Sequence, residues 1–204
     1  EGSSVLQTAG LTTQFARLRN ARQPPTIMVD HTKDELTMFR TIADFSNLWK
    51  DETQATQRTL DALTDASLAQ KIDDDHRTLG RVAWHVTGTV KEMMERTGLK
   101  IDGPGEHDPV PASAKTIAET FARSAQSLAD AVRTNWTDDS LKMMDNMYGD
   151  KWSRGHTLLF LITHQAHHRG QMNVLMRQAG LRAPAIYGPA REDWAKYQMQ
   201  PPAI

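Results

Sequence analysis

Two histidines four residues apart have the spacing of metal ligands on one helix. His164 and His168 fall in a segment of helical periodicity, so their side chains project from the same face, one turn apart. The same face carries Leu161 and Leu175, which predicts that both imidazole rings point into the core. Neutral imidazoles that converge can each give a lone pair to one metal ion. The pair therefore predicts part of a metal site that needs a third ligand.

The third ligand is predicted to be His85, in another helical segment. It lies between Trp84 and Val86, at the edge of the apolar stripe of that segment. The alternative is that the three histidines are ordinary core residues, which requires every buried ring to find its own hydrogen-bond partner. For three rings in this pattern we favour a metal site formed by His85, His164 and His168.

The motif differs from the His-Glu-x-x-His motif of zinc peptidases at its second position. Gln165 stands there, and an amide cannot act as a general base, so a peptidase of that type is disfavoured. His167 lies one residue off the ligand face and is expected at the surface or beside the site. The remaining histidines are expected to face solvent near helix ends or in loops: His31, His76, His107 and His156.

A site of three neutral histidines leaves the full charge of the metal in place. It also leaves at least one open coordination position, as in catalytic zinc sites. Water, a thiol or a substrate oxygen could bind there, and the metal would lower the pKa of the water or the thiol. The site therefore suits thiol transfer and hydrolysis alike. Zinc is the favoured ion, while nickel, iron, manganese and cobalt are alternatives.

Two carboxylates are candidates to assist this site. Glu52 lies on an otherwise apolar helix face and is the candidate catalytic base, or a residue that orients a ligand histidine. Glu92 follows His85 by seven residues, on the same face. Each could instead be a solvated helix carboxylate, and this alternative is stronger for Glu92. Arg169 and Gln171 could contact substrate or a second subunit, but we favour a salt bridge and a hydrogen bond that hold the helices together.

Aromatic residues in the predicted loops and tail could surround the mouth of a pocket, because their rings offer apolar area with a polar tip. They could equally seal one end of the helices. These residues are Trp136, Tyr148, Trp152, Tyr187 and Trp194.

The elements that must position these residues are helices. Apolar residues recur at steps of three and four in segments 32–63, 75–97, 113–134 and 153–180, and a last short helix is predicted at 192–198. Thr32 and Glu35 have the spacing of a capping box at the first start. Residues 135–152 are predicted to form a structured loop with one helical turn at 140–147, and no strand pattern is found. The segments predict an all-α protein, a four-helix bundle.

Length and composition indicate which kind of protein this is. The 204 residues carry a net charge of −1 and no cysteine, which excludes disulfides and thiolate metal sites. No apolar run approaches the length of a membrane span, so a cytoplasmic protein is expected. Residues 1–27 are expected to be disordered or loosely docked. They are also expected to be added or read-through sequence that precedes a natural start at Met28. Residues 28–204 are expected to form a single domain.

The residues also resemble the DinB family. The stretch 164–171 (His-Gln-Ala-His-His-Arg-Gly-Gln), the later Gly180 and the run Ile186-Tyr187-Gly188 carry the resemblance, together with 84–86 (Trp-His-Val) and Glu92. It implies an up-down-down-up four-helix bundle with a divalent metal on the same three histidines. It also implies a homodimer and, for characterised relatives, a low-molecular-weight thiol co-substrate such as bacillithiol, mycothiol or glutathione.

Three functions remain open on this basis. The first is a metal-dependent enzyme that activates a small thiol or water, an S-transferase in the thiol case. The second is a metal-dependent hydrolase of esters, lactones or phosphoesters, and the third is a metal-binding stress protein without turnover. The partner is expected to be a small-molecule substrate, not a membrane. Nucleic-acid binding is disfavoured because the net charge is near zero and no basic stripe is found.

Overall fold

The computed structural model describes residues 39–105 and 107–203. By compactness the chain divides into residues 1–36 and 37–204, and everything described below lies in the second unit. The predicted N-terminal segment 1–27 and the predicted helix start at 32–38 lie outside the described residues. The described part is mainly helical, with the long helices α1 (Ile42–Asp61), α2 (Leu79–Glu95), α3 (Ala114–Asn135) and α4 (Arg154–Gln178). None of its helices is long and apolar enough to cross a membrane.

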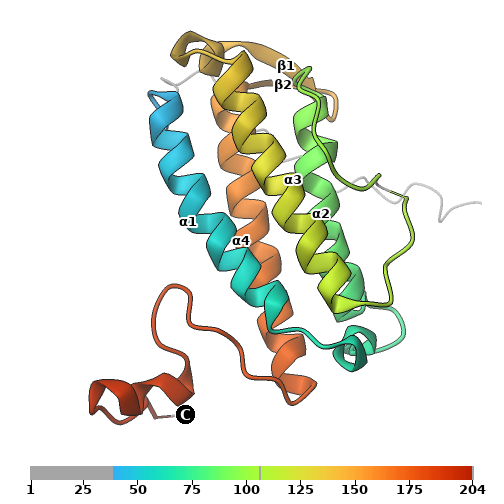
Figure 1. Ribbon diagram of the computed structural model, residues 1–204, viewed down its shortest axis with the longest axis vertical. Coiled ribbons are helices and arrows are strands. Elements are labelled where there is room, and N and C mark those ends of the chain that lie inside the picture. The colour runs from blue at the N-terminus through green and yellow to red at the C-terminus, as the bar shows by residue number, and fades with distance from the viewer. Residues whose placement is uncertain (1–38, 106, 204) are drawn as a thin grey trace, which may run out of the picture. The chain divides into compact units, whose positions relative to one another are not determined.

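The four long helices pack side by side along most of their length (Figure 1). Helix α1 contacts α3 and α4, and α2 contacts the same two helices. Following the colours along the chain, α1 and α4 run in one direction and α2 and α3 in the other. The apolar stripes predicted from the sequence meet between them in one continuous core, which includes Phe45, Trp49, Val86, Ile117, Phe121, Leu128, Leu161 and Met172.

Helix starts are set by side-chain caps, and two of them lie later than predicted. The Thr41 hydroxyl accepts from the backbone N–H of Asp44 at 3.1 Å, and the Asp44 carboxylate accepts from the N–H of Thr41 at 2.9 Å. This capping box starts α1 at Ile42, so a helix running without interruption from Thr32 is wrong. In the same way Thr78, not the region of Asp75, caps α2.

The loop between α3 and α4 contains the only strands in the described part of the chain. A 3₁₀ helix, η2 (Asp138–Lys142), precedes the antiparallel pair β1 (Met144–Met147) and β2 (Asp150–Ser153), in which Met144 pairs with Ser153. Tyr148 and Gly149 both have positive φ, 57° and 98°, as a two-residue hairpin turn requires. The predicted helical turn at 140–147 is present as η2, but it lies earlier, at 138–142, and residues 144–147 form a strand that the sequence did not predict.

Two further 3₁₀ helices complete the described structure. Helix η1 (Asp65–Ala69) follows α1 and packs against α2. Helix α4 ends before Gly180, whose φ is 76°, as the sequence predicts. The chain then continues to η3 (Arg191–Tyr197), which an ion pair between Glu192 and Arg177 ties back to α4.

Candidate metal centre

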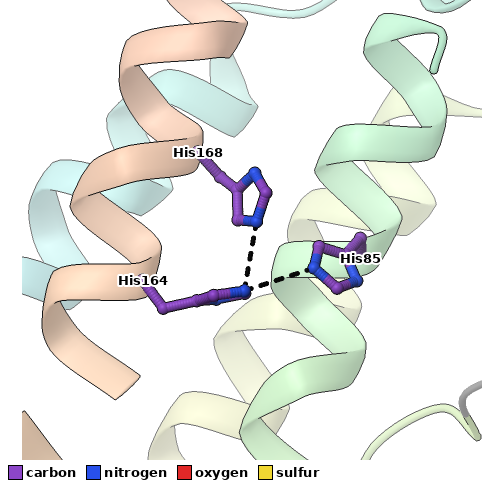
Figure 2. A group of neighbouring side chains, drawn as sticks. All are labelled: His85, His164 and His168. Atoms are coloured by element: carbon purple, nitrogen blue, oxygen red, sulfur yellow. Dashed lines mark hydrogen bonds between the residues drawn. The ribbon is translucent and has the colours of Figure 1, made fainter. Parts of the chain in front are cut away.

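Helices α2 and α4 bring the three predicted ligands together. His164 and His168 project from successive turns of α4 towards α2, and His85 meets them from α2 (Figure 2). The Nε2 atom of His164 lies 3.3 Å from Nε2 of His85 and 3.1 Å from Nε2 of His168. One potential ligand atom from each residue lies within 4.8 Å of the others.

This geometry fits one divalent metal ion. Nitrogens bound to a tetrahedral zinc at about 2.0–2.1 Å lie roughly 3.3–3.4 Å from one another, which is close to the separations found here. Hydrogen bonding alone explains the arrangement poorly, because the Nε2 atom of His164 faces two other Nε2 atoms and a neutral ring nitrogen can be either a donor or an acceptor, not both. The Nδ1 atom of His164 is buried and has no hydrogen-bond partner among the described residues.

The surroundings keep these rings neutral. Burial lowers the pKa of His85 and of His164 from the ordinary 6.5 to about 4, and it also lowers the pKa of His168. The positive charge of Arg77 acts in the same direction on all three rings. At neutral pH each ring therefore has a lone pair available for a metal ion.

Gln171 holds the ring of His168. The Nδ1 atom of His168 lies 2.7 Å from the Gln171 side-chain oxygen, so Nδ1 carries the proton and donates it. The lone pair of the neutral ring is then on Nε2, the atom that faces the other two histidines. The amide nitrogen of Gln171 in turn lies 3.1 Å from Nε2 of His167. Gln171 was predicted only to help hold the helices together, although the three-residue step from His168 to Gln171 signals this contact.

Glu52 lies in a polar cluster between α1, α4 and the segment after α4, in which Glu52 and Arg169 are buried and Tyr187 is exposed. Its carboxylate pairs with Arg169 and accepts from the hydroxyl of Tyr187 at 2.7 Å. Arg169, only 2% exposed, also donates to the backbone oxygen of Glu52 at 3.1 Å and to the hydroxyl of Thr56 at 2.9 Å. The predicted salt bridge of Arg169 is thus present. Among the described residues, the hydrogen bonds of Glu52 go to this cluster and not to the three histidines.

Glu92 lies on the same face of α2 as His85 and lines a pocket with it. Its carboxylate accepts from the Tyr148 hydroxyl at 2.7 Å and pairs with Arg96 at 2.7 Å. The Arg96 guanidinium also stacks 4.5 Å from the centre of the Tyr148 ring. Glu92 is therefore partly buried and held in place, not simply solvated.

A row of aromatic rings runs from the hairpin to the histidines. The ring of Trp152 lies 5.8 Å from that of Tyr148 and 4.9 Å from that of Phe160, centre to centre, and Phe160 stacks 6.3 Å from His164. Phe160 is exposed, and it was not among the residues predicted from the sequence. Its step of four residues before His164 was the available signal. The other predicted aromatic positions lie apart from this row.

Two of those other aromatic residues have contacts that hold the structure together. Trp136 is buried beneath the guanidinium of Arg154 at 4.9 Å, and Tyr187 belongs to the Glu52 cluster. Three histidines expected to face solvent are exposed as predicted, namely His76, His107 and His156, and His167 is exposed too. His31 lies outside the described residues.

The packed helices and the three histidines between α2 and α4 place this protein among helical proteins with a potential metal site. The chain belongs to the DinB family, whose sequence profile matches residues 28–202. It is 46% identical over 167 residues to the uncharacterised protein YrdA of Bacillus subtilis strain 168, covering 82% of this chain and 100% of that protein.

Solved structures agree with this assignment. A DinB-like protein from Bacillus cereus ATCC 10987 is 45% identical, with a TM-score of 0.71 over 74% of this chain and 100% of its own. The DinB-like protein YjoA from Bacillus subtilis is only 12% identical, with a TM-score of 0.51 over 71% of this chain and 99% of its own, and shows likeness of fold alone.

Proposed function

We propose that this protein is a divalent-metal-dependent enzyme whose metal is held by His85, His164 and His168. The observation that carries the proposal is the convergence of three neutral ring nitrogens at separations that suit one ion. A metal bound there would lower the pKa of a small thiol or a water molecule that binds beside it. We favour thiol transfer as the reaction, with zinc as the ion and a low-molecular-weight thiol as co-substrate.

The protein's own residues support such a site in three ways. Gln171 fixes the tautomer of His168, and burial keeps the rings unprotonated at neutral pH. Phe160 and Trp152 offer an apolar surface beside His164 for the body of a substrate. Glu92, held by Arg96 and Tyr148, is a carboxylate beside the ligands that could accept a proton. The role of Glu52 as the base stays a prediction.

Two alternatives use the same three histidines. A hydrolase of esters, lactones or phosphoesters would activate water in place of a thiol. A metal-binding stress protein would hold the ion without turnover. Activity in buffer without thiol supports the hydrolase, and tight metal binding without any turnover supports the third function.

We also propose that the four long helices form an up-down-down-up four-helix bundle and that the protein is a homodimer. The directions of the helices and their contacts support the bundle. Large apolar side chains exposed on α4 and the C-terminal segment support the dimer, and they include Val174, Tyr187, Tyr197 and Met199. Light scattering at micromolar concentration should give twice the chain mass of 22.9 kDa, and a mass equal to one chain would refute the dimer.

Metal analysis of the purified protein is the first test of the site. We expect one divalent ion per chain in the wild type and in His76→Ala, a control at an exposed histidine. His164→Ala and His168→Ala should each lose tight binding while circular dichroism stays helical. Unchanged stoichiometry in both variants would refute the site. The metal-loaded wild type is then assayed against electrophiles with and without thiols, and against chromogenic esters.

A further inference from the structure

A small pocket opens beside His85 on the α2 side of the proposed metal centre. Its volume is about 110 Å³, a few times the roughly 30 Å³ that a water molecule occupies in the liquid. Arg77, Arg81, Gly88 and Glu92 line it together with His85. From Arg81 onwards these residues follow one another on α2 at steps of four, three and four, so they share one helix face. The pocket therefore lies along the same stripe as a metal-ligand candidate.

The two arginines in this pocket have no acidic partner among the described residues. Neither Arg77 nor Arg81 takes part in an ion pair with any residue that the structure describes, although Arg96, Arg154, Arg169, Arg177 and Arg182 all do. Arg81 is half-buried. Two arginines without an ion pair among the described residues thus line the space beside the proposed ion.

The carboxylate on the same stripe does not neutralise them. Glu92 is engaged by Arg96 and by the hydroxyl of Tyr148, at 2.7 Å each. Glycine at position 88 keeps the middle of the pocket open, because an added Cβ there would meet only the Pro104 ring at 3.9 Å. Arg77, Arg81 and Glu92 are the charged residues that line the pocket apart from His85, so its lining is positive overall, and the proposed metal would add to that charge.

We propose that Arg77 and Arg81 bind an anionic group, a carboxylate or a phosphate, of the small molecule whose other end reaches the metal. The planar guanidinium group suits either anion through paired hydrogen bonds. The inference rests on the proposed function, since it assigns a substrate class to the same site. It makes the substrate or co-substrate an anion with a short apolar body, positioned between the arginines and the row of Trp152 and Phe160.

The first test uses protein loaded with Co²⁺, whose absorption spectrum reports a bound thiolate. Mercaptoacetate, 3-mercaptopropionate and 4-mercaptobutyrate are titrated against mercaptoalcohols of the same chain lengths. We expect at least one mercaptocarboxylate to bind about tenfold more tightly than its alcohol counterpart, the effect of a charge-assisted hydrogen bond. Arg77→Gln and Arg81→Gln should each bring that ratio close to one. Arg58→Gln, at an exposed arginine on α1, should leave it unchanged.

The second test needs no metal and separates this inference from the proposed function. The metal-free protein is treated with phenylglyoxal, which modifies arginines, in the presence of acetate or inorganic phosphate, and modified peptides are measured by mass spectrometry. Protection of Arg77 and Arg81 but not Arg58 by either anion supports the pocket, and the more effective anion identifies the group. Equal binding of both thiol series together with no protection would overturn the inference. Failure to bind Co²⁺, with Arg77 and Arg81 still protected by an anion, would overturn the proposed function and leave the anion-binding pocket standing.

Discussion

His168 differs from the other two proposed ligands in how its second ring nitrogen is held. Its Nδ1 donates to Gln171 at 2.7 Å, whereas Nδ1 of His164 has no partner among the described residues. A partner on Nδ1 fixes the tautomer and the ring orientation that a ligand needs. At the scale of single residues, we therefore expect Gln171 to be the side chain outside the proposed ligand set with the most direct influence on metal affinity.

Replacing Gln171 tests this influence. Gln171→Leu should weaken metal binding about tenfold to a hundredfold, the usual cost of losing a hydrogen-bond partner of a ligand. Competition with a chromophoric chelator measures the affinity. Gln178→Leu, an exposed glutamine on the same helix, should bind metal like the wild type. Equal affinities of the two variants would mean that Gln171 does not orient His168.

Glu52 can be assigned a role by separating stability from chemistry. In Glu52→Gln the buried Arg169 loses its counter-charge, so we expect the free energy of unfolding in urea to fall by about 3 kcal/mol. Metal affinity should stay unchanged. Replacing Arg169 by Met in the same chain should recover part of the loss, because no unpaired charge then remains buried. Lost activity with unchanged stability would instead support the catalytic base predicted from the sequence.

At the scale of the elements, helix α2 contains two glycines, Gly80 and Gly88, that differ in how much space surrounds them. A Cβ on Gly80 would lie 3.1 Å from both Cβ and the backbone oxygen of Leu68 in η1, whereas a Cβ on Gly88 would make only an ordinary contact. The close packing of η1 on α2 thus depends on glycine at position 80. The helix interior at position 88 has room for a methyl group.

Alanine substitutions at the two positions should have opposite signs. Gly88→Ala should raise the free energy of unfolding by about 0.5–1 kcal/mol, the usual gain from alanine inside a helix. Gly80→Ala should lower it by about 1–2 kcal/mol, because a backbone oxygen cannot move aside without shifting η1. Urea unfolding of both variants measures the difference. A stabilised Gly80→Ala would show that η1 can move away from α2 without cost.

The sequence predicted the location and the buried face of each long helix more reliably than the residue at which the helix starts. Steps of three and four located the helix faces, including the ligands on α2 and α4. The sequence offers more than one possible N-terminal cap before α1, and spacing alone does not show which one starts the helix. In the structure, Thr41 and Asp44 form the capping box of α1. The hairpin between α3 and α4 was missed because two strands of four residues are too short to show alternation, and its turn places Tyr148, a residue without a turn preference, at positive φ.

The candidate site divides in the same way. Helical spacing could predict which residues share a face, and these are His85 and Glu92 on α2 and His164 and His168 on α4. Spacing could not predict contacts that depend on how two elements pack together. The salt bridge of Arg169 was therefore predicted, but its partners Glu52 and Tyr187 were not. The positive charge around the histidines was not predicted either, because nothing in the sequence distinguishes Arg77 and Arg81 from arginines at the surface such as Arg58.

At the scale of the whole molecule, the three histidines should make the stability of the metal-free protein depend on pH. Burial lowers the folded-state pKa of His85 and His164 to about 4, against 6.5 for exposed histidine, and that of His168 also falls. Between these values the unfolded chain binds more protons than the folded one, so acid favours unfolding. The free energy of unfolding should therefore decrease as the pH falls from about 6.5 to 4.

Urea unfolding of the metal-free protein at pH 7, 6, 5 and 4.5 measures this dependence. His164→Phe should unfold with a shallower pH dependence than the wild type, because one group with a lowered pKa is gone. His76→Gln, at an exposed histidine, should keep the wild-type slope. Carboxylates contribute equally to all three proteins, so the difference between slopes isolates the buried ring. A saturating divalent metal should raise the stability at pH 7 and make its loss in acid steeper, since protons then displace the ion as well. Identical slopes for His164→Phe and the wild type would contradict the proposal that the core of this protein holds its histidines neutral and available to a metal ion.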